Sequence, residues 1–198
     1  MKIDLREIPT YWATIEKNTD RHQKMESMFK DLNMMDTHQL NGEIADPYTV
    51  GIAQSHIDGL SNDLPLLMLE DDAKDTEHWE PLIEVPDHCD ALYLGTSWFG
   101  MVRGESQYKG CISSVFDKEY LKIYNMLGVH AVLYLTQEYR DFVVELLETF
   151  KKNPQGGCDE CVAANMKSFD VLAVNKPFFY QNDGHSEEET LRPLYPYF

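Results

Sequence analysis

The sequence predicts a single α/β domain. Short apolar runs of strand type alternate along the chain with longer segments whose apolar residues recur at helical spacing. The chain has 198 residues, of which 43% are hydrophobic, so it is long enough for one core. No internal repeat or interdomain linker divides it. We therefore expect one domain over residues 1–198, with a core at about 9–188 and a tail at 182–198.

The first part of the chain predicts three strands and two helices. Residues 9–15 are rich in aromatic and β-branched residues, which favour a strand. Apolar residues then recur at helical spacing up to Leu32, so a helix should begin near Thr19 or Asp20. Residues 37–40 suggest a short second strand, and residues 49–60 fit a helix with an apolar side. A third strand follows at residues 64–69.

The second part of the chain predicts further strands at 91–95, 129–135 and 171–174 and helices at 137–151 and 159–166. Residues 73–87 are acidic and contain two prolines, so we expect a helix followed by a loop there. Residues 96–111 are rich in Gly, Ser and aromatics, which indicates a long surface loop or hairpin. Its aromatic residues either stack on a ligand or belong to the core. They are Trp98, Phe99 and Tyr108.

Composition excludes several classes of function. The net charge is -17, so the chain is a poor match to nucleic-acid backbones, and an anionic substrate would need a local cation. No apolar run approaches the roughly 20 residues of a membrane span, and the N-terminus has no signal-peptide core. We therefore expect a soluble, cytoplasmic protein. Four cysteines, including the single pair Cys158 and Cys161, favour reduced structural thiols over a zinc or redox site.

The run Leu64–Leu69 ends abruptly in three carboxylates, Glu70, Asp71 and Asp72. Three adjacent acids cannot all be buried without a compensating cation, so they should lie at the carboxyl end of the strand. Open α/β sheets bind ligands at that edge, and Mg²⁺ and Mn²⁺ prefer oxygen ligands of this kind. A solvated acidic turn is the alternative that these residues alone leave open.

The order of motifs along about residues 9–188 resembles glycosyltransferase family 25, which includes bacterial lipooligosaccharide glycosyltransferases and collagen galactosyltransferases. The acidic strand end resembles the metal motif of that family, and Ser55-His56 resembles its Gly-x-x-x-Ser-His block. The remaining similar segments lie in the same order. They are Asp20-Arg21 with Met25, Tyr93-Leu94-Gly95, Gly128–Ala131, Asp159, and Pro177 with Gln181 and Ser186.

The resemblance implies a nucleotide-sugar transferase of the glycosyltransferase A-type fold, which has a mixed, mostly parallel central sheet flanked by helices and binds the donor at the strand ends. The implied reaction is the metal-dependent, inverting transfer of a hexose, galactose or a related sugar, from a UDP-sugar to a hydroxyl of a glycan or another acceptor. The implied cofactor is Mn²⁺ or Mg²⁺. Asp72 would be its direct ligand, with His185 as a second ligand and Asp183 as the alternate.

The resemblance also assigns donor-binding and catalytic residues. Asp159 would deprotonate the acceptor hydroxyl, with its neighbour Glu160 as the alternate; the competing reading is that Asp159 caps its helix. Arg21 would pair with the donor diphosphate or form an ordinary salt bridge, and a helix-face histidine such as His56 is often structural. The donor-binding set comprises Arg21, Ser55, His56, Glu70, Asp71 and Gln181.

Two other functions remain open at the level of sequence. One is a catalytically inactive module that keeps the nucleotide-sugar pocket. The other is a metal-dependent phosphohydrolase, which would need further carboxylates to converge on a second metal. The available carboxylates are Asp117, Asp141 and Asp170, although their spacing does not link them to the acidic strand end.

Overall fold

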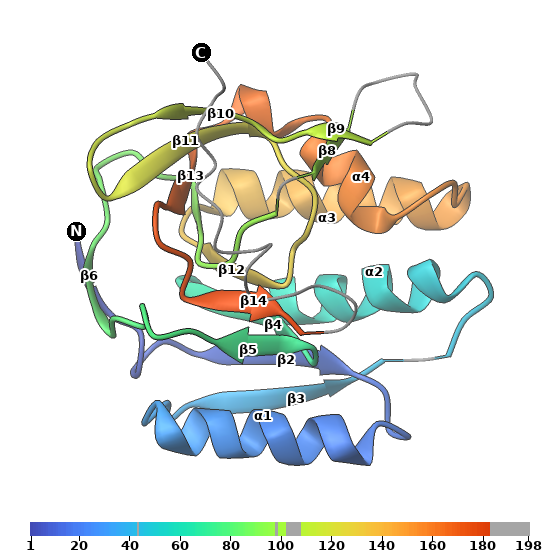
Figure 1. Cartoon of the computed structure of the whole chain (residues 1–198). Helices are drawn as coiled ribbons and strands as arrows, with labels where there is room; N and C mark the ends of the chain where they lie inside the picture. The colour runs from blue at the N-terminus through green and yellow to red at the C-terminus, as the bar shows by residue number, and fades with distance from the viewer. Residues whose placement is uncertain (43, 98, 102–107, 183–198) are drawn as a thin grey trace.

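The computed structural model describes residues 1–42, 44–97, 99–101 and 108–182. Its centre is an eight-stranded sheet in the order β10-β11-β13-β7-β12-β4-β2-β3 (Figure 1). The strands of this sheet are β2 (Thr10–Thr14), β3 (Thr37–Asn41), β4 (Leu66–Glu70), β7 (Ala91–Tyr93), β10 (Ile112–Val115), β11 (Tyr120–Asn125), β12 (Ala131–Tyr134) and β13 (Val171–Val174). The helices are α1 (Thr19–Asp31), α2 (Tyr48–Leu60), α3 (Gln137–Lys152) and α4 (Cys158–Ala163), with a 3₁₀ turn at Met166–Ser168.

The prediction of an α/β fold with a mixed sheet is confirmed, but the prediction of mostly parallel pairing is wrong. β3, β2 and β4 are parallel neighbours, and so are β7 and β13. β12 runs antiparallel between β4 and β7, and β11 runs antiparallel to both of its neighbours. Antiparallel contacts therefore outnumber parallel ones, although six of the eight strands point the same way. A short apolar run shows that a strand exists but does not encode its direction.

The sheet is covered on both faces. On one face, α1 packs against the sheet through Met25, Met28 and Phe29. α2, α3 and α4 pack on the other face, through residues such as Ala53, Val143 and Val162. Burial on both faces explains why the central strands read as continuous apolar runs rather than as alternating patterns. Among the described residues, no helix is long and apolar enough to cross a membrane.

Alternation along β4 decides where the acids after it point. Leu67 and Leu69 belong to the core on the α1 side, whereas Leu66 and Met68 belong to the core on the α2 side. Successive side chains of a strand point to opposite faces. Glu70 therefore continues the row that faces α2, and Asp71 turns towards α1.

The predicted helix-plus-loop at residues 73–87 is wrong, because this segment holds two short strands. β5 (Ala73–Asp75) pairs antiparallel with β14 (Phe179–Gln181), and β6 (Leu82–Glu84) pairs antiparallel with β1 (Lys2–Asp4). Strands of three residues are too short for alternation to show in the sequence. The β5–β14 pair matters for function because it follows the acidic strand end directly.

The predicted loop or hairpin at residues 96–111 contains an antiparallel pair, β8 (Phe99–Met101) and β9 (Tyr108–Gly110). Phe99 is exposed. The sequence did not predict β10 and β11, which follow this hairpin and form one side of the sheet. Trp98 lies outside the described residues.

Candidate functional site

Glu70 is the last residue of β4 and faces α2. His56 on that helix lies with its Nε2 3.1 Å from Glu70 Oε1, and its side chain is only 2% exposed. α2 thus holds a buried histidine against Glu70, the first acid after the apolar run. The contact shows that His56 positions the Glu70 carboxylate, and donor binding by either residue stays a prediction.

Asp71 points to the opposite side and is held by three groups. Arg21 on α1 donates to its Oδ1 at 2.5 Å, while Thr14 Oγ1 and Asn18 Nδ2 donate to its Oδ2 at 2.5 and 3.1 Å. The side chain of Asp71 is 9% exposed, whereas that of Arg21 is 33% exposed. The pair therefore ties the start of α1 to the end of β4 and leaves part of the guanidinium at the surface of the site.

Asp72 and Glu70 converge on one amide group. Gln181 Nε2 donates to Glu70 Oε2 at 3.3 Å and to Asp72 Oδ2 at 3.4 Å. Gln181 is placed by the β5–β14 pairing, in which it lies opposite Ala73. The structure thus joins Gln181 to the acidic motif across more than a hundred residues of sequence.

Asp159 lies in the first turn of α4. The N-cap residue of that helix is Gly157, so Asp159 does not occupy the N-cap position, although its carboxylate accepts a hydrogen bond from its own backbone N–H in the first turn. Its Oδ2 accepts a hydrogen bond from the Gly128 N–H at 3.0 Å. Gly128 has a φ of 91°, a conformation that favours glycine. The segment before β12 and the start of α4 thereby fix the carboxylate in place.

The pKa values of Glu70 and Asp159 are shifted in opposite directions. Burial alone would raise the pKa of Glu70, but the hydrogen bond to His56 and the charges of His56 and His130 outweigh it and lower that pKa. Burial raises the pKa of Asp159; the Gly128 N–H opposes the shift and the nearby charge of Glu70 adds to it. Two neighbouring carboxylates with separated pKa values are a common arrangement for acid–base chemistry.

Three adjoining cavities meet at the acidic strand end. The middle one, of about 500 Å³, lies among the ends of β2 and β3 and the side of α2, and Ile15, Gly42 and Ser55 line it. It shares Arg21, Asp71 and Asp72 with a cavity of about 420 Å³ beside α1. It shares Tyr48, Ile52, Glu70 and Gln181 with a cavity of about 440 Å³ that contains Asp159. Of the predicted site residues that the structure describes, all except His56 therefore line one or more of these adjoining cavities.

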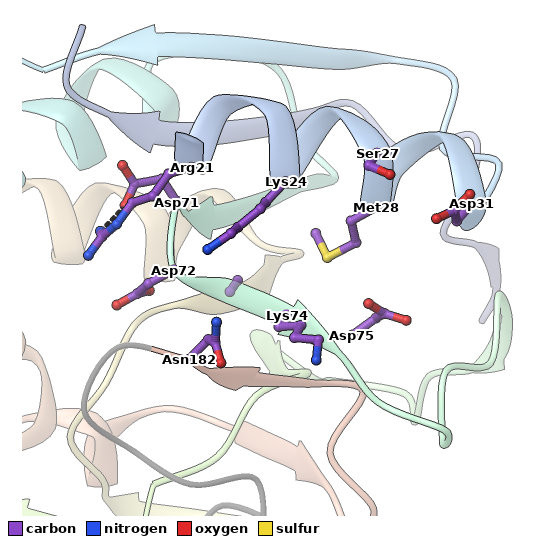
Figure 2. A pocket seen from close by; sticks show the side chains of 11 residues that line it. Arg21, Lys24, Ser27, Met28, Asp31, Asp71, Asp72, Lys74, Asp75 and Asn182 are labelled. Carbon is purple, nitrogen blue, oxygen red and sulfur yellow. Dashed lines mark hydrogen bonds and ion pairs between the residues drawn. The ribbon is translucent and has the colours of Figure 1, made fainter. Parts of the chain in front are cut away.

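Two lysines that the sequence did not single out line the cavity beside α1. Lys24 extends from α1 and Lys74 from β5, on either side of the space next to Asp72 (Figure 2). Lys74 also lies 5.6 Å from the centre of the Tyr180 ring. The only sequence signal for Lys24 is its position one helical turn after Arg21, which places both on one face of α1.

Ser55 lines the middle cavity but is 4% exposed, and its hydroxyl donates to the Gly51 carbonyl within α2 at 3.1 Å. Its contribution is to pack beside Gly42, where an added Cβ would overlap its oxygen. His185 and the alternate Asp183 lie outside the described residues, so their predicted metal roles stay predictions.

The four cysteines are free, and burial disfavours their thiolates. Burial raises the pKa of Cys161 to about 11 and that of Cys89 to about 12, and it also raises the pKa of Cys158. Reactive cysteines have lowered pKa values. The pair Cys158 and Cys161 therefore contributes packing at the start of α4.

The described residues fit a divalent ion in one particular way. They include no group of three or more His, Cys, Asp or Glu side chains that could hold a metal by itself. Glu70 and Asp72 nevertheless bring two carboxylates to one amide, and Mg²⁺-type ions are commonly bound by one or two carboxylates together with phosphate oxygens and water. The donor set thus suits a metal that arrives with a phosphorylated ligand.

No protein-family profile matches the chain, and no curated protein matches it.

Proposed function

We propose that the protein is a metal-dependent glycosyltransferase that moves a hexose from a UDP-sugar to a hydroxyl of a glycan or a similar acceptor. The observation that carries the proposal is the convergence of Glu70, Asp72, Gln181 and Asp159 on adjoining cavities at the carboxyl end of β4. The motif order that resembles glycosyltransferase family 25 supports it. The mixed α/β sheet is compatible with the glycosyltransferase A-type fold that this resemblance implies.

The middle cavity is the proposed place for the nucleoside. Its walls include the ends of β2 and β3 near Ile15 and Gly42, and its volume of about 500 Å³ falls in the range of small-molecule sites. Asp71 would accept from the ribose only through an oxygen that its three protein donors leave accessible, so its main proposed role is to hold Arg21 at the cavity wall.

The diphosphate would lie beside Asp72, where the middle cavity meets the cavity next to α1. A protein with a net charge of -17 needs local cations to bind a diphosphate. Arg21 and Lys24 supply positive charge from α1, and Lys74 supplies it from β5. A Mn²⁺ or Mg²⁺ ion held by Asp72, with Glu70 and Gln181 beside it, would neutralise charge on the leaving diphosphate.

The acceptor would lie in the cavity that contains Asp159. Its carboxylate would take the proton of the attacking hydroxyl, and its raised pKa makes it a stronger base than an ordinary aspartate. Tyr48 and Phe99, both largely exposed, line the same cavity and offer flat apolar surfaces for a sugar ring.

The test is calorimetric titration of UDP with and without Mn²⁺. We expect UDP to bind with Mn²⁺, and Asp72→Asn to remove the Mn²⁺-dependent part because it deletes the proposed ligand. Asp75→Asn is the matched control, since Asp75 lines the same cavity but lies further along β5. His185→Ala tests the second predicted ligand in the same assay. No heat of UDP binding under either condition would refute the proposal.

Two alternatives are distinguished by turnover. An inactive binding module would bind UDP with Mn²⁺ but neither hydrolyse nor transfer a UDP-sugar. A phosphohydrolase with two metals is disfavoured because its extra carboxylates have other partners. Asp117 accepts backbone hydrogen bonds from Glu119 and Tyr120, and Asp170 pairs with Lys122. Asp141 pairs with the adjacent Arg140 on α3.

A further inference from the structure

His22 lies in the first turn of α1, next to the end of β2. Its Nε2 is 3.0 Å from Thr14 Oγ1 and 3.1 Å from the Ile15 carbonyl oxygen. The rings of His22 and Trp12 meet edge to face, with their centroids 5.6 Å apart. Thr14 and Ile15 line the middle cavity, whereas His22 lines none of the three cavities of the site. His22 therefore supports the wall of the middle cavity from behind.

The Thr14 hydroxyl decides which nitrogen of His22 carries a proton. A threonine hydroxyl has one proton to donate, and an ionised carboxylate only accepts. The Thr14 hydroxyl lies 2.5 Å from Asp71 Oδ2 but 3.4 Å from the Ile15 carbonyl oxygen, so it donates to Asp71. The hydrogen bond between Thr14 and His22 must then be donated by the histidine. Since the Ile15 carbonyl is also an acceptor, His22 is protonated at Nε2.

Asp71 connects these contacts to Arg21. Thr14 and Asn18 both donate to Asp71 Oδ2, and Arg21 donates to Oδ1. Asn18 is the N-cap residue of α1, yet its side chain makes no capping hydrogen bond and donates to Asp71 instead. Figure 2 shows the Asp71 carboxylate and the Arg21 guanidinium pointing towards each other. The direction of the carboxylate therefore determines where the guanidinium lies at the cavity wall.

We propose that His22 is a positioning residue for the anion-binding part of the site. Its Nε2–H fixes the Thr14 hydroxyl, this hydroxyl fixes Asp71, and Asp71 holds the guanidinium of Arg21. Binding groups are held precisely when the residues behind them are themselves fixed by hydrogen bonds and packing. The inference rests on the proposed function in one respect, because that function makes a nucleoside diphosphate the group that Arg21 meets.

The competing explanation is that His22 only packs against Trp12, which is 3% exposed. Packing alone does not require Nε2 to lie within hydrogen-bond distance of two oxygens. Two substitutions separate the explanations. His22→Phe keeps an aromatic ring beside Trp12 but has no donor, whereas His22→Gln loses the ring but keeps an N–H donor at the end of the side chain.

Two measurements without ligand test the contact between His22 and Thr14. In nitrogen-15 magnetic resonance at about pH 8, above the ordinary titration range of histidine, we expect His22 to be protonated at Nε2 and not at Nδ1. His22→Phe should also lower Tm less when Thr14→Val is already present, because the hydroxyl that it leaves without a donor is then absent. Protonation at Nδ1, or equal losses of Tm in the two backgrounds, would overturn the proposal.

Calorimetric titration of UDP with Mn²⁺ tests the effect on the site. We expect His22→Phe to weaken UDP binding by about 3–10-fold, the size of one lost hydrogen bond, and His22→Gln to recover most of that loss. In an Arg21→Gln background, His22→Phe should make no further difference, because the guanidinium that it positions is gone. His38→Phe is the matched control, since His38 pairs with Asp36 at the surface and lines none of the three cavities.

The outcomes separate this inference from the proposed function. Unchanged UDP binding in His22→Phe, no recovery in His22→Gln, or a loss that persists beside Arg21→Gln would overturn the role of His22. A wild type that binds no UDP would refute the proposed function instead. The two measurements without ligand then decide whether His22 holds the Thr14 hydroxyl.

Discussion

Glu70 and Asp159 are neighbouring carboxylates in opposite environments. Glu70 is kept charged by His56 and His130, whereas Asp159 is buried, accepts backbone hydrogen bonds from Gly128 and from its own N–H, and lies near the charges of Glu70 and Glu160. Glu70 thus stays ionised, as a carboxylate beside a diphosphate-bound metal ion should, whereas Asp159 is suited to taking up a proton. Exchanging their roles would require exchanging the surroundings as well as the side chains.

Asp159→Asn should abolish most turnover while making the protein more stable. The folded protein holds the Asp159 proton more tightly than the unfolded chain does, because burial raises its pKa. The cost to stability is absent below the ordinary aspartate pKa, grows as pH rises through the folded value, and stays constant above it. At neutral pH we expect a higher Tm, and a kcat lower by about 10²–10⁴-fold.

Thermal melts at neutral and acidic pH check the stability part, and the gain in Tm should shrink in acid. Asp141→Asn is the control, since this carboxylate is 58% exposed and pairs with Arg140 at the surface. A lower Tm at neutral pH in Asp159→Asn would show that the carboxylate stabilises the fold.

His56→Leu should destabilise the protein through Glu70. Because the His56 side chain is 2% exposed and that of Glu70 is 19% exposed, the substitution leaves a buried acceptor without its closest donor. We expect a loss of roughly 1–3 kcal/mol in the free energy of unfolding, measured by urea denaturation. The loss should be smaller when Glu70→Gln is already present. Equal losses in both backgrounds would assign the effect to packing alone.

Residue identity alone could predict some of these roles. A buried run followed by three acids correctly predicted that Glu70, Asp71 and Asp72 end a core strand. It could not assign the three acids to different partners, because those partners come from α1, α2 and β14. Nor could it show that Asp159 accepts from Gly128, since this depends on how two loops meet.

At the scale of elements, the close approach of β7 and β12 near the site depends on a glycine. A Cβ added at Gly95 would overlap the imidazole of His130, which is 2% exposed. The Leu94 and Gly95 N–H groups both donate to the Ala131 carbonyl, so the backbone there cannot easily move away. The position therefore keeps a glycine so that His130 can lie near Glu70.

Gly95→Ala should lower the free energy of unfolding by about 1–3 kcal/mol, as overpacking of a core usually does. The loss that Gly95→Ala causes should be smaller when His130→Ala is already present than it is in the wild type. Chemical denaturation of the four proteins measures the coupling. Strictly additive losses would show that His130 is not the group that an alanine meets.

Elements with long apolar patterns were predicted well. The predicted helix at 49–60 is α2, the helix at 137–151 is α3, and the strands at 9–15 and 171–174 are β2 and β13. The errors fall on three-residue strands and on β10 and β11, and the exposed apolar residues of β10 did not show a two-residue period. Pairing partners fix such elements, and single-chain patterns carry little information about partners.

At the scale of the whole molecule, charge sets a general cost. The net charge of -17 makes the folded chain repel itself, and salt screens this repulsion. We expect Tm to rise by several degrees between about 0.01 and 0.15 M NaCl. Differential scanning calorimetry measures the change, and an equal osmolality of a neutral solute should not reproduce it. A constant Tm would show that cations already balance the charge locally.

Gln181 can join the acidic strand end only after most of the described chain has been synthesised. The strands that present Glu70 and Asp72 can form early during synthesis, but the amide that joins these acids is synthesised more than a hundred residues later. Closing so long a loop is entropically costly, and the β5–β14 pair forms only when residues 179–181 have left the ribosome. Because β13 is itself an inner strand of the sheet, the sheet and the site both become complete only when the last part of the described chain has been synthesised.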